Sequence, residues 1–254
     1  MISKNHIKYI QSLHSKKNRQ EHSVFIIEGI KLVLEFLKTD VFEIQEVLGV
    51  DEFITKHEDL LLKQQIHFSV ISEDELKKIS TQNSPNQVLA LVSMPNKLIS
   101  KEPLANEIYL FLDDIRDPGN LGTIIRIADW FGISNVFCSK QSTEVYNPKT
   151  LQASMGAILR VNVTYIDFED VLSKLPHLPI YGAILNGENI YRSQLKSGII
   201  VIGNEANGIS QSVLSKIKYP ITIPSAHING SESLNAANAC AIICSEFHRQ
   251  LNHK

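Results

Sequence analysis

One apolar run, Gly198–Ile202, constrains the fold of this chain more than any other segment. Its last four side chains (IIVI) leave no polar face for solvent, and such runs are typical of strands buried on both faces of a parallel sheet. Parallel neighbours require long crossover connections, which are usually helices. Strand-like and helix-like segments do alternate along the chain, so the sequence predicts an α/β fold.

The alternation is interrupted between residues 94 and 106, where two prolines and several polar residues indicate a linker. We place this linker at residues 96–105, between a small α/β domain at 1–95 and a larger parallel-sheet domain at 106–254. Strands are expected at residues 23–27, 44–50, 67–71, 87–93, 108–112, 135–138, 180–185, 198–202 and 221–223. Helices are expected at residues 4–19, 31–38, 51–65, 123–131, 151–159 and 234–251. Another helix is expected after Ser72, which is a suitable N-cap because Glu75 stands at N3.

The composition is that of an ordinary soluble protein, with 43% hydrophobic and 20% charged residues. No apolar run approaches the roughly 20 residues that span a bilayer, and the first residues do not resemble a signal peptide. The three cysteines have neither disulfide nor zinc spacing, and Cys240 and Cys244 fit one buried helix face. We therefore expect a cytoplasmic protein with no membrane contact and no metal.

The first 31 residues are basic, with six Lys or Arg against two acidic residues, although the whole chain has a net charge of −2. Two interpretations remain open. The cluster is either a solvated helix face or an arm that contacts nucleic-acid phosphates. The residues assigned to phosphate contact are Lys4, Lys16, Lys17 and Arg19.

Three predicted strands end in polar loops that contain glycine or asparagine. The first loop is Asp117–Gly122, with Arg126 shortly after it; the second is Gly203–Gly208; the third is Pro224–Asn235. In an open α/β sheet, ligands gather beyond the carboxyl ends of the strands, so these loops are the candidate site.

Each loop also has a purely structural interpretation. Asn120 is a suitable helix cap, Glu205 is a suitable first-turn acid, and Ser233 and Asn235 are suitable caps of the last helix. The glycine spacing matches neither a Walker-type phosphate loop nor the dinucleotide fingerprint. No Cys/His cluster has metal-ligand spacing, and no Ser-His-Asp arrangement stands out.

Taken together, the loops resemble the three motifs of the SpoU (TrmH) family of RNA ribose methyltransferases. The matching stretches are DPGNLG with Arg126, GNEANG, and Ile223-Pro224 followed by Ser233-Leu234-Asn235. The segments Tyr146–Lys149 and Ala153–Ala157 also resemble this family. The resemblance covers residues 106–254, and the first 95 residues resemble, less specifically, the ribosomal-protein-like RNA-binding domain that often precedes this catalytic domain.

The resemblance implies a trefoil-knotted domain and a homodimer whose active site is completed across the interface. It implies methyl transfer from S-adenosylmethionine to a ribose 2′-hydroxyl in structured RNA, with ribosomal RNA favoured because of the separate N-terminal domain. The cofactor-binding residues implied are Ile202, Gly203, Ile223, Pro224 and Leu234. The catalytic residues implied are Asn120, Arg126, Glu205, Ser233 and Asn235.

Three positions depart from the family pattern. Eight residues separate Pro224 from Ser233, which lengthens the third motif; Ala206 and Gln152 stand where glycine and arginine are common. Alternatives to the ribosomal-RNA enzyme are the same chemistry on transfer RNA, a non-catalytic RNA-binding protein, or an unrelated α/β enzyme that binds another nucleotide. Ligand preference separates the last, because S-adenosylhomocysteine would then bind no better than NAD or ATP.

Overall fold

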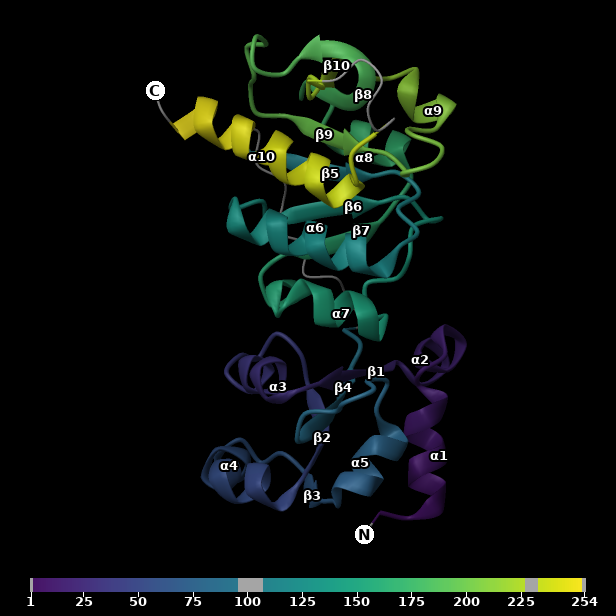
Figure 1. The fold of residues 1–254 in the computed structure, drawn as a ribbon, viewed down its shortest axis with the longest axis vertical. Coiled ribbons are helices and arrows are strands. Elements are labelled where there is room, and N and C mark those ends of the chain that lie inside the picture. The colour runs from purple at the N-terminus through teal and green to yellow at the C-terminus, as the bar shows by residue number, and fades with distance from the viewer. Residues whose placement is uncertain (1, 96–106, 227–232, 253–254) are drawn as a thin grey trace. The chain divides into compact units, whose positions relative to one another are not determined.

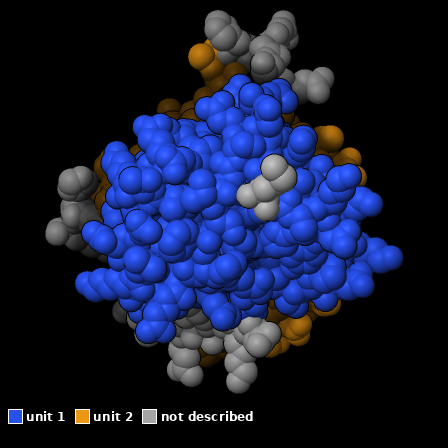
Figure 2. Space-filling view, turned by 90° about the horizontal axis from the view of Figure 1, so that it is seen from below, with its two compact units in different colours: residues 1–97, 146–159 blue, residues 98–145, 160–254 orange. Residues whose placement is uncertain are grey.

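The computed structural model describes residues 2–95, 107–226 and 233–252. The chain forms two compact units, one of residues 1–97 with 146–159 and one of residues 98–145 with 160–254 (Figure 2). Each unit has its own sheet and helices, so the predicted α/β class is confirmed (Figure 1). The linker predicted at residues 96–105 lies outside the described residues.

The first unit is built on a four-stranded sheet in the order β1-β4-β2-β3, in which only β2 and β3 are parallel. Its strands are β1 (Val24–Glu28), β2 (Ile44–Gly49), β3 (Phe68–Val70) and β4 (Val88–Ser93). Its helices are α1 (Lys4–Ser12), α2 (Lys16–His22), α3 (Ile30–Phe36), α4 (Asp51–Lys63), α5 (Glu73–Ile79) and α7 (Pro148–Ser154). The predicted capping box of α5 is confirmed: Ser72 accepts from the Glu75 amide, and Glu75 accepts from the Ser72 amide.

The predicted single helix at residues 4–19 is wrong, because the chain turns between α1 and α2. The guanidinium of Arg19 stabilises this turn, with Nη1 2.8 Å from the carbonyl oxygens of both Leu13 and His14. Arg19 is only 1% exposed, and burial lowers the pKa of its side chain. The assignment of Arg19 to RNA contact is therefore corrected, since its guanidinium donates to backbone carbonyl groups inside the unit.

Residues 146–159 pack in the first unit although they lie between segments of the second. The Tyr146 ring stacks on Phe25 with centroids 4.6 Å apart, and burial raises the pKa of Tyr146 to about 12. The helix predicted at 151–159 is α7 followed by a short 3₁₀ turn at Ala157–Leu159. The two are separated because Met155 is left-handed, at φ 50°, and Gly156 follows at φ 83°.

The second unit contains a six-stranded parallel sheet in the order β10-β8-β9-β5-β6-β7. Its strands are β5 (Tyr109–Leu112), β6 (Asn135–Cys138), β7 (Asn162–Tyr165), β8 (Ile180–Asn189), β9 (Ile199–Ile202) and β10 (Tyr219–Thr222). Its helices are α6 (Pro118–Trp130), α8 (Phe168–Lys174), α9 (Gln211–Leu214) and α10 (Ala236–Asn252). All four residues of β9 are buried, as the apolar run predicts, whereas β7, α8 and α9 were not predicted.

Helix α6 begins five residues earlier than predicted. Asp117 is its N-cap, because its side chain accepts the Asn120 amide hydrogen at 2.8 Å, and Pro118 occupies the first helical position. The structural interpretation that made Asn120 the cap is therefore wrong. Its side chain remains available for contacts outside the helix.

The three cysteines are buried thiols, as predicted for Cys240 and Cys244, which contact each other on α10 with sulfurs 3.8 Å apart. Burial raises the pKa of Cys138 far above its usual range. Within the described ranges, the helices are too short or too polar to cross a membrane. The same residues contain no group of three or more His, Cys, Asp or Glu side chains arranged to hold a metal ion.

Candidate active site

The first and second loops leave the sheet side by side, because β5 and β9 are neighbours with Leu112 paired to Ile202. Strands β6 and β7 extend from β5 in one direction, and β8 and β10 extend from β9 in the other. After β5 the chain continues to β6 on one side of this pair, and after β9 it continues to β10 on the other side. The β5–β9 pair is therefore the reversal point of the strand order. In open α/β sheets this point is the usual ligand site.

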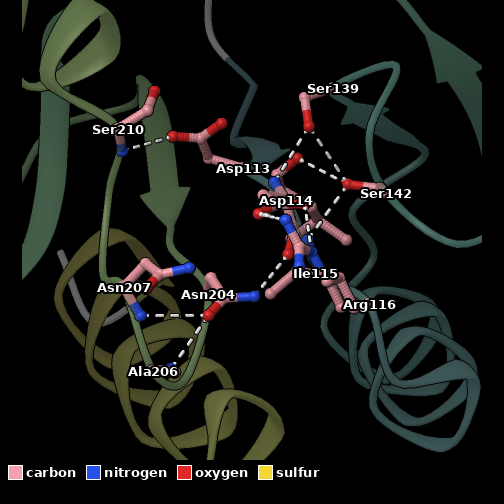
Figure 3. Close-up of polar contacts among 11 residues, drawn as sticks. Asp113, Asp114, Ile115, Arg116, Ser139, Ser142, Asn204, Ala206, Asn207 and Ser210 are labelled. Carbon is pink, nitrogen blue, oxygen red and sulfur yellow. Dashed lines mark hydrogen bonds and ion pairs between the residues drawn. The ribbon is translucent and has the colours of Figure 1, made fainter.

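Asn204 fastens the second loop to the segment between β5 and α6, which leads into the first loop (Figure 3). Its Nδ2 donates to the carbonyl oxygen of Asp114 at 2.8 Å, and its Oδ1 accepts from the amides of Ala206 and Asn207 at 2.9 and 3.0 Å. The backbones of Asn204 and Gly208 also bond to each other and close the loop. All the polar atoms of the Asn204 amide are engaged, so the loop has one defined conformation.

Asp113 holds the chain just beyond the second loop, since its carboxylate accepts from the Ser210 amide at 2.7 Å (Figure 3). The side chain lies directly after β5 and is 4% exposed. A hydrogen bond to a buried carboxylate is among the stronger kinds in proteins. The resemblance did not single out Asp113, but a charged residue at the end of a fully apolar strand is the signal that identifies it.

Two serines that follow β6 hold the segment between β5 and α6 (Figure 3). Ser139 Oγ accepts the Asp114 amide hydrogen at 2.9 Å, and Ser142 Oγ accepts that of Ile115 at 3.1 Å. Asp114 is left-handed, at φ 56°, and its carboxylate pairs with Arg116, which raises the pKa of Arg116. The backbone that leads into α6 is therefore held on both sides.

Asn120, on the first turn of α6, joins all three loops. Its Nδ2 donates to the carboxylate of Glu205 in the second loop, and its Oδ1 accepts from Asn235 Nδ2 at 2.9 Å in the third. These residues are 85 and 115 positions away from Asn120. Glu205 lies in a turn before α9, so its interpretation as a first-turn helix acid is wrong.

Asn235 has two roles at once. Its Oδ1 accepts from the amides of Ala237 and Asn238 at 3.0 and 3.3 Å, which caps α10 as the structural interpretation predicted. Its Nδ2 is the group that donates to Asn120. Ser233 lies nearby and is exposed, while the longer part of the third motif, residues 227–232, lies outside the described residues.

Arg126 lies six residues after Asn120 on α6 and is exposed. Among the residues that the structure describes, its guanidinium has no hydrogen-bond or ion-pair partner. An arginine in this state can bind a phosphate or carboxylate with two parallel hydrogen bonds.

A cavity of about 520 Å³ lies between the second and third loops and the middle of β8. This volume falls within the roughly 300–1,000 Å³ of small-molecule sites. Apolar side chains and loop backbone form its walls, which suits a ligand with a flat aromatic ring and polar edges. The lining includes Ile202, Gly203, Glu205, Ile223, Ser233 and Leu234.

The sequence-predicted site residues thus converge on one edge of the sheet, but with different roles. Four of the five implied cofactor residues line the cavity, and Pro224 does not. Ala206 does not adopt the positive φ that would favour glycine there. In the first unit, Lys4, Lys16 and Lys17 are exposed, as a phosphate-contacting arm requires.

The reversal point at β5–β9, the interlocked loops and the adjoining cavity are typical of an α/β enzyme that binds a small molecule beyond its parallel sheet. The profile of the SpoU rRNA methylase family matches residues 107–245, and that of the MRM3-like substrate binding domain matches residues 4–90. The chain belongs to the SpoU rRNA methylase family. This membership confirms the predicted family and the predicted class of enzyme, an RNA methyltransferase.

Individual relatives match this chain over nearly all of its length. It is 30% identical over 241 residues to the 23S rRNA (guanosine(2553)-2′-O)-methyltransferase RlmP of Bacillus subtilis, with 93% of each chain covered. A TrmH-family protein from Porphyromonas gingivalis superposes with a TM-score of 0.84 at 36% identity, covering 98% of this chain and 99% of its own. An AdoMet-bound rRNA methyltransferase from Sinorhizobium meliloti superposes with a TM-score of 0.86 at 25% identity, covering 99% and 97%.

Proposed function

We propose that this protein transfers the methyl group of S-adenosylmethionine to a ribose 2′-hydroxyl in large-subunit ribosomal RNA. The observation that carries the proposal is the position of Asn120, which joins Glu205 and Asn235 beside a cavity of cofactor size and on the same helix as Arg126. The B. subtilis relative is named as a methyltransferase of this kind, and it supports the choice of substrate.

The cavity fits S-adenosylmethionine by size and by the chemistry of its walls. Ile202, Ile223 and Leu234 would hold the adenosine part between apolar groups, and the backbone around Gly203 offers partners for polar edges. A Cβ atom on Gly203 would lie 2.4 Å from the carbonyl carbon of Gly208, so only glycine permits this closed loop. Bound there, the cofactor supplies an activated methyl group on a sulfonium.

Arg126 acts on the RNA side of the reaction. A ribose hydroxyl becomes a good nucleophile only as its proton leaves, and a guanidinium stays protonated at neutral pH. Arg126 therefore grips the phosphate next to the reacting ribose and stabilises the negative charge that develops on the 2′-oxygen as its proton passes to a water molecule. Asn120 and Asn235 hold the loops on either side in register, and Glu205 accepts from Asn120.

The active form is a homodimer whose second copy completes the site. Trp130 supports this assignment: it lies one helical turn after Arg126 on α6 and is 84% exposed. Trp is enriched at protein interfaces, so an exposed Trp beside Arg126 fits a contact with the second copy. Trp130→Asp is expected to give monomers in light scattering and to lose activity, whereas dimers at full activity would contradict this role.

The first unit recognises the RNA. Lys4, Lys16 and Lys17 provide exposed positive charge on α1 and α2, and the matching profile is that of a substrate-binding domain. Replacing all three lysines with glutamine is expected to weaken RNA binding and to reduce its salt dependence. We also propose that the protein works in the cytoplasm.

The deciding experiment is methyl transfer from radiolabelled S-adenosylmethionine to RNA and to ribosomal particles, followed by separation of the RNA by size. The label should enter large-subunit RNA and survive alkaline hydrolysis as a resistant dinucleotide. Arg126→Ala should abolish it, while Arg192→Ala, an exposed arginine outside the site, should not. Label in transfer RNA would overturn the proposed substrate. The absence of label together with the absence of S-adenosylhomocysteine binding would overturn the proposed enzymatic activity.

A further inference from the structure

The guanidinium of Arg126 has an acidic neighbour on its own helix. Asp129 follows it by three positions on α6, and at that spacing two Cβ atoms lie about 5–6 Å apart. Arginine and aspartate at this spacing are close enough to form an ion pair on a helix surface. Such a pair would occupy the group that must bind an RNA phosphate.

In this structure Asp129 is paired elsewhere. Arg160 Nε lies 2.9 and 3.0 Å from the two carboxylate oxygens, and Arg160 Nη2 lies 2.8 Å from Oδ2. This geometry is the two-pronged form in which a carboxylate is most fully engaged. The side chain of Asp129 is 24% exposed and that of Arg160 is 52% exposed, so the contact lies at the surface beside Arg126.

We propose that Arg160 is a positioning residue, which keeps Arg126 available for RNA by occupying the carboxylate of Asp129. The inference rests on the proposed function, because it assigns a purpose to the guanidinium of Arg126, which has no partner among the described residues. Arg160 acts in two ways. It removes a competing partner of Arg126, and it neutralises a negative charge that would repel the incoming phosphate.

A purely structural role makes a different prediction. Arg160 is the first residue of the second unit after residues 146–159, so its contact with Asp129 also fastens the returning chain to α6. If fastening were its purpose, removing either partner would do equal harm. If charge occupation is its purpose, Arg160 is needed only while Asp129 carries its charge.

The test is a cycle of substitutions at the two positions in the full-length protein. Arg160→Gln is expected to lower kcat/KM for ribosomal RNA about fivefold to tenfold, with a smaller loss at high salt, since exposed charges are screened. Asp129→Asn alone should stay within about twofold of wild type. The double variant should recover to that level, and Arg160→Lys should keep most of the activity.

Two controls separate this inference from folding and from the proposed function. S-adenosylhomocysteine affinity and melting temperature should be the same in all variants. Ribosomal RNA binding without cofactor, measured by filter retention, should weaken in Arg160→Gln and recover in the double variant. Recovery of binding without methyl transfer by any of the proteins would refute the proposed function and leave this inference standing. Equal defects in Asp129→Asn, Arg160→Gln and the double variant would overturn the inference.

Discussion

Replacing Asn120 tests whether the three loops must be held together for catalysis. Asn120→Ala removes two side-chain hydrogen bonds, one to the Glu205 carboxylate and one from Asn235. Neutral bonds contribute about 0.5–1.5 kcal/mol and bonds to charged groups about 1.5–3 kcal/mol when shielded from water. Because this contact is exposed, we expect about 2 kcal/mol in all, which corresponds to a roughly 30-fold fall in kcat/KM.

Asn120→Asp tests the donor alone. The new carboxylate keeps the acceptor for Asn235 but faces the carboxylate of Glu205. Two like charges in contact raise the pKa of one of them, so at lower pH they share a proton and the O–H can donate to Glu205. The activity of Asn120→Asp relative to wild type should therefore rise as the pH falls from about 8 to about 5.5.

The assay is single-turnover methyl transfer to ribosomal RNA across this pH range, with S-adenosylhomocysteine binding measured on the same proteins. Arg192→Ala serves as the control for surface substitutions in the same unit. Wild-type kcat/KM in Asn120→Ala would refute the coupling of the loops. A constant activity ratio for Asn120→Asp over the pH range would refute the role of the donated hydrogen.

Three further outcomes follow from contacts elsewhere in the chain. Gly203→Ala would bring a Cβ atom within 2.5 Å of the Ile209 amide nitrogen, so S-adenosylhomocysteine affinity by calorimetry should fall at least about tenfold, and unchanged affinity would contradict the tight loop. Arg19→Met leaves one buried and one partly buried carbonyl oxygen without their donor, and urea unfolding should show a loss of about 2 kcal/mol. In native protein a thiol reagent should label none of the cysteines, and denaturation should expose all of them: Cys138, Cys240 and Cys244.

The parts of the fold that local pattern determines could be predicted from the sequence. Strand β9 is apolar on both faces because both faces are covered, and the burial of all four residues follows from that composition. The capping box of α5 is likewise decided within four residues. The start of α6 was misjudged because Pro118-Gly119 also suits a turn, and only the Asp117 cap decides for the helix.

Contacts between distant segments explain what the sequence could not show. Arg19 belongs to a basic cluster by composition, yet the turn after α1 buries its guanidinium against carbonyl groups. The segment at 146–159 continues the second unit along the chain, yet Tyr146 stacks on Phe25 of the first. The pairing of Asp129 with Arg160 rather than with its helical neighbour depends on where the chain returns to α6.

The structural and functional interpretations of the loop residues do not exclude each other, because one residue can satisfy both. A side-chain amide has an acceptor end and a donor end. Asn235 uses its oxygen to cap α10, and this fixes its nitrogen toward Asn120. Asp117 caps α6 and thereby leaves both ends of the Asn120 amide for Glu205 and Asn235. The caps therefore orient the three loops of the proposed site, and a substitution that preserves the cap but removes the second group should keep stability while it lowers activity.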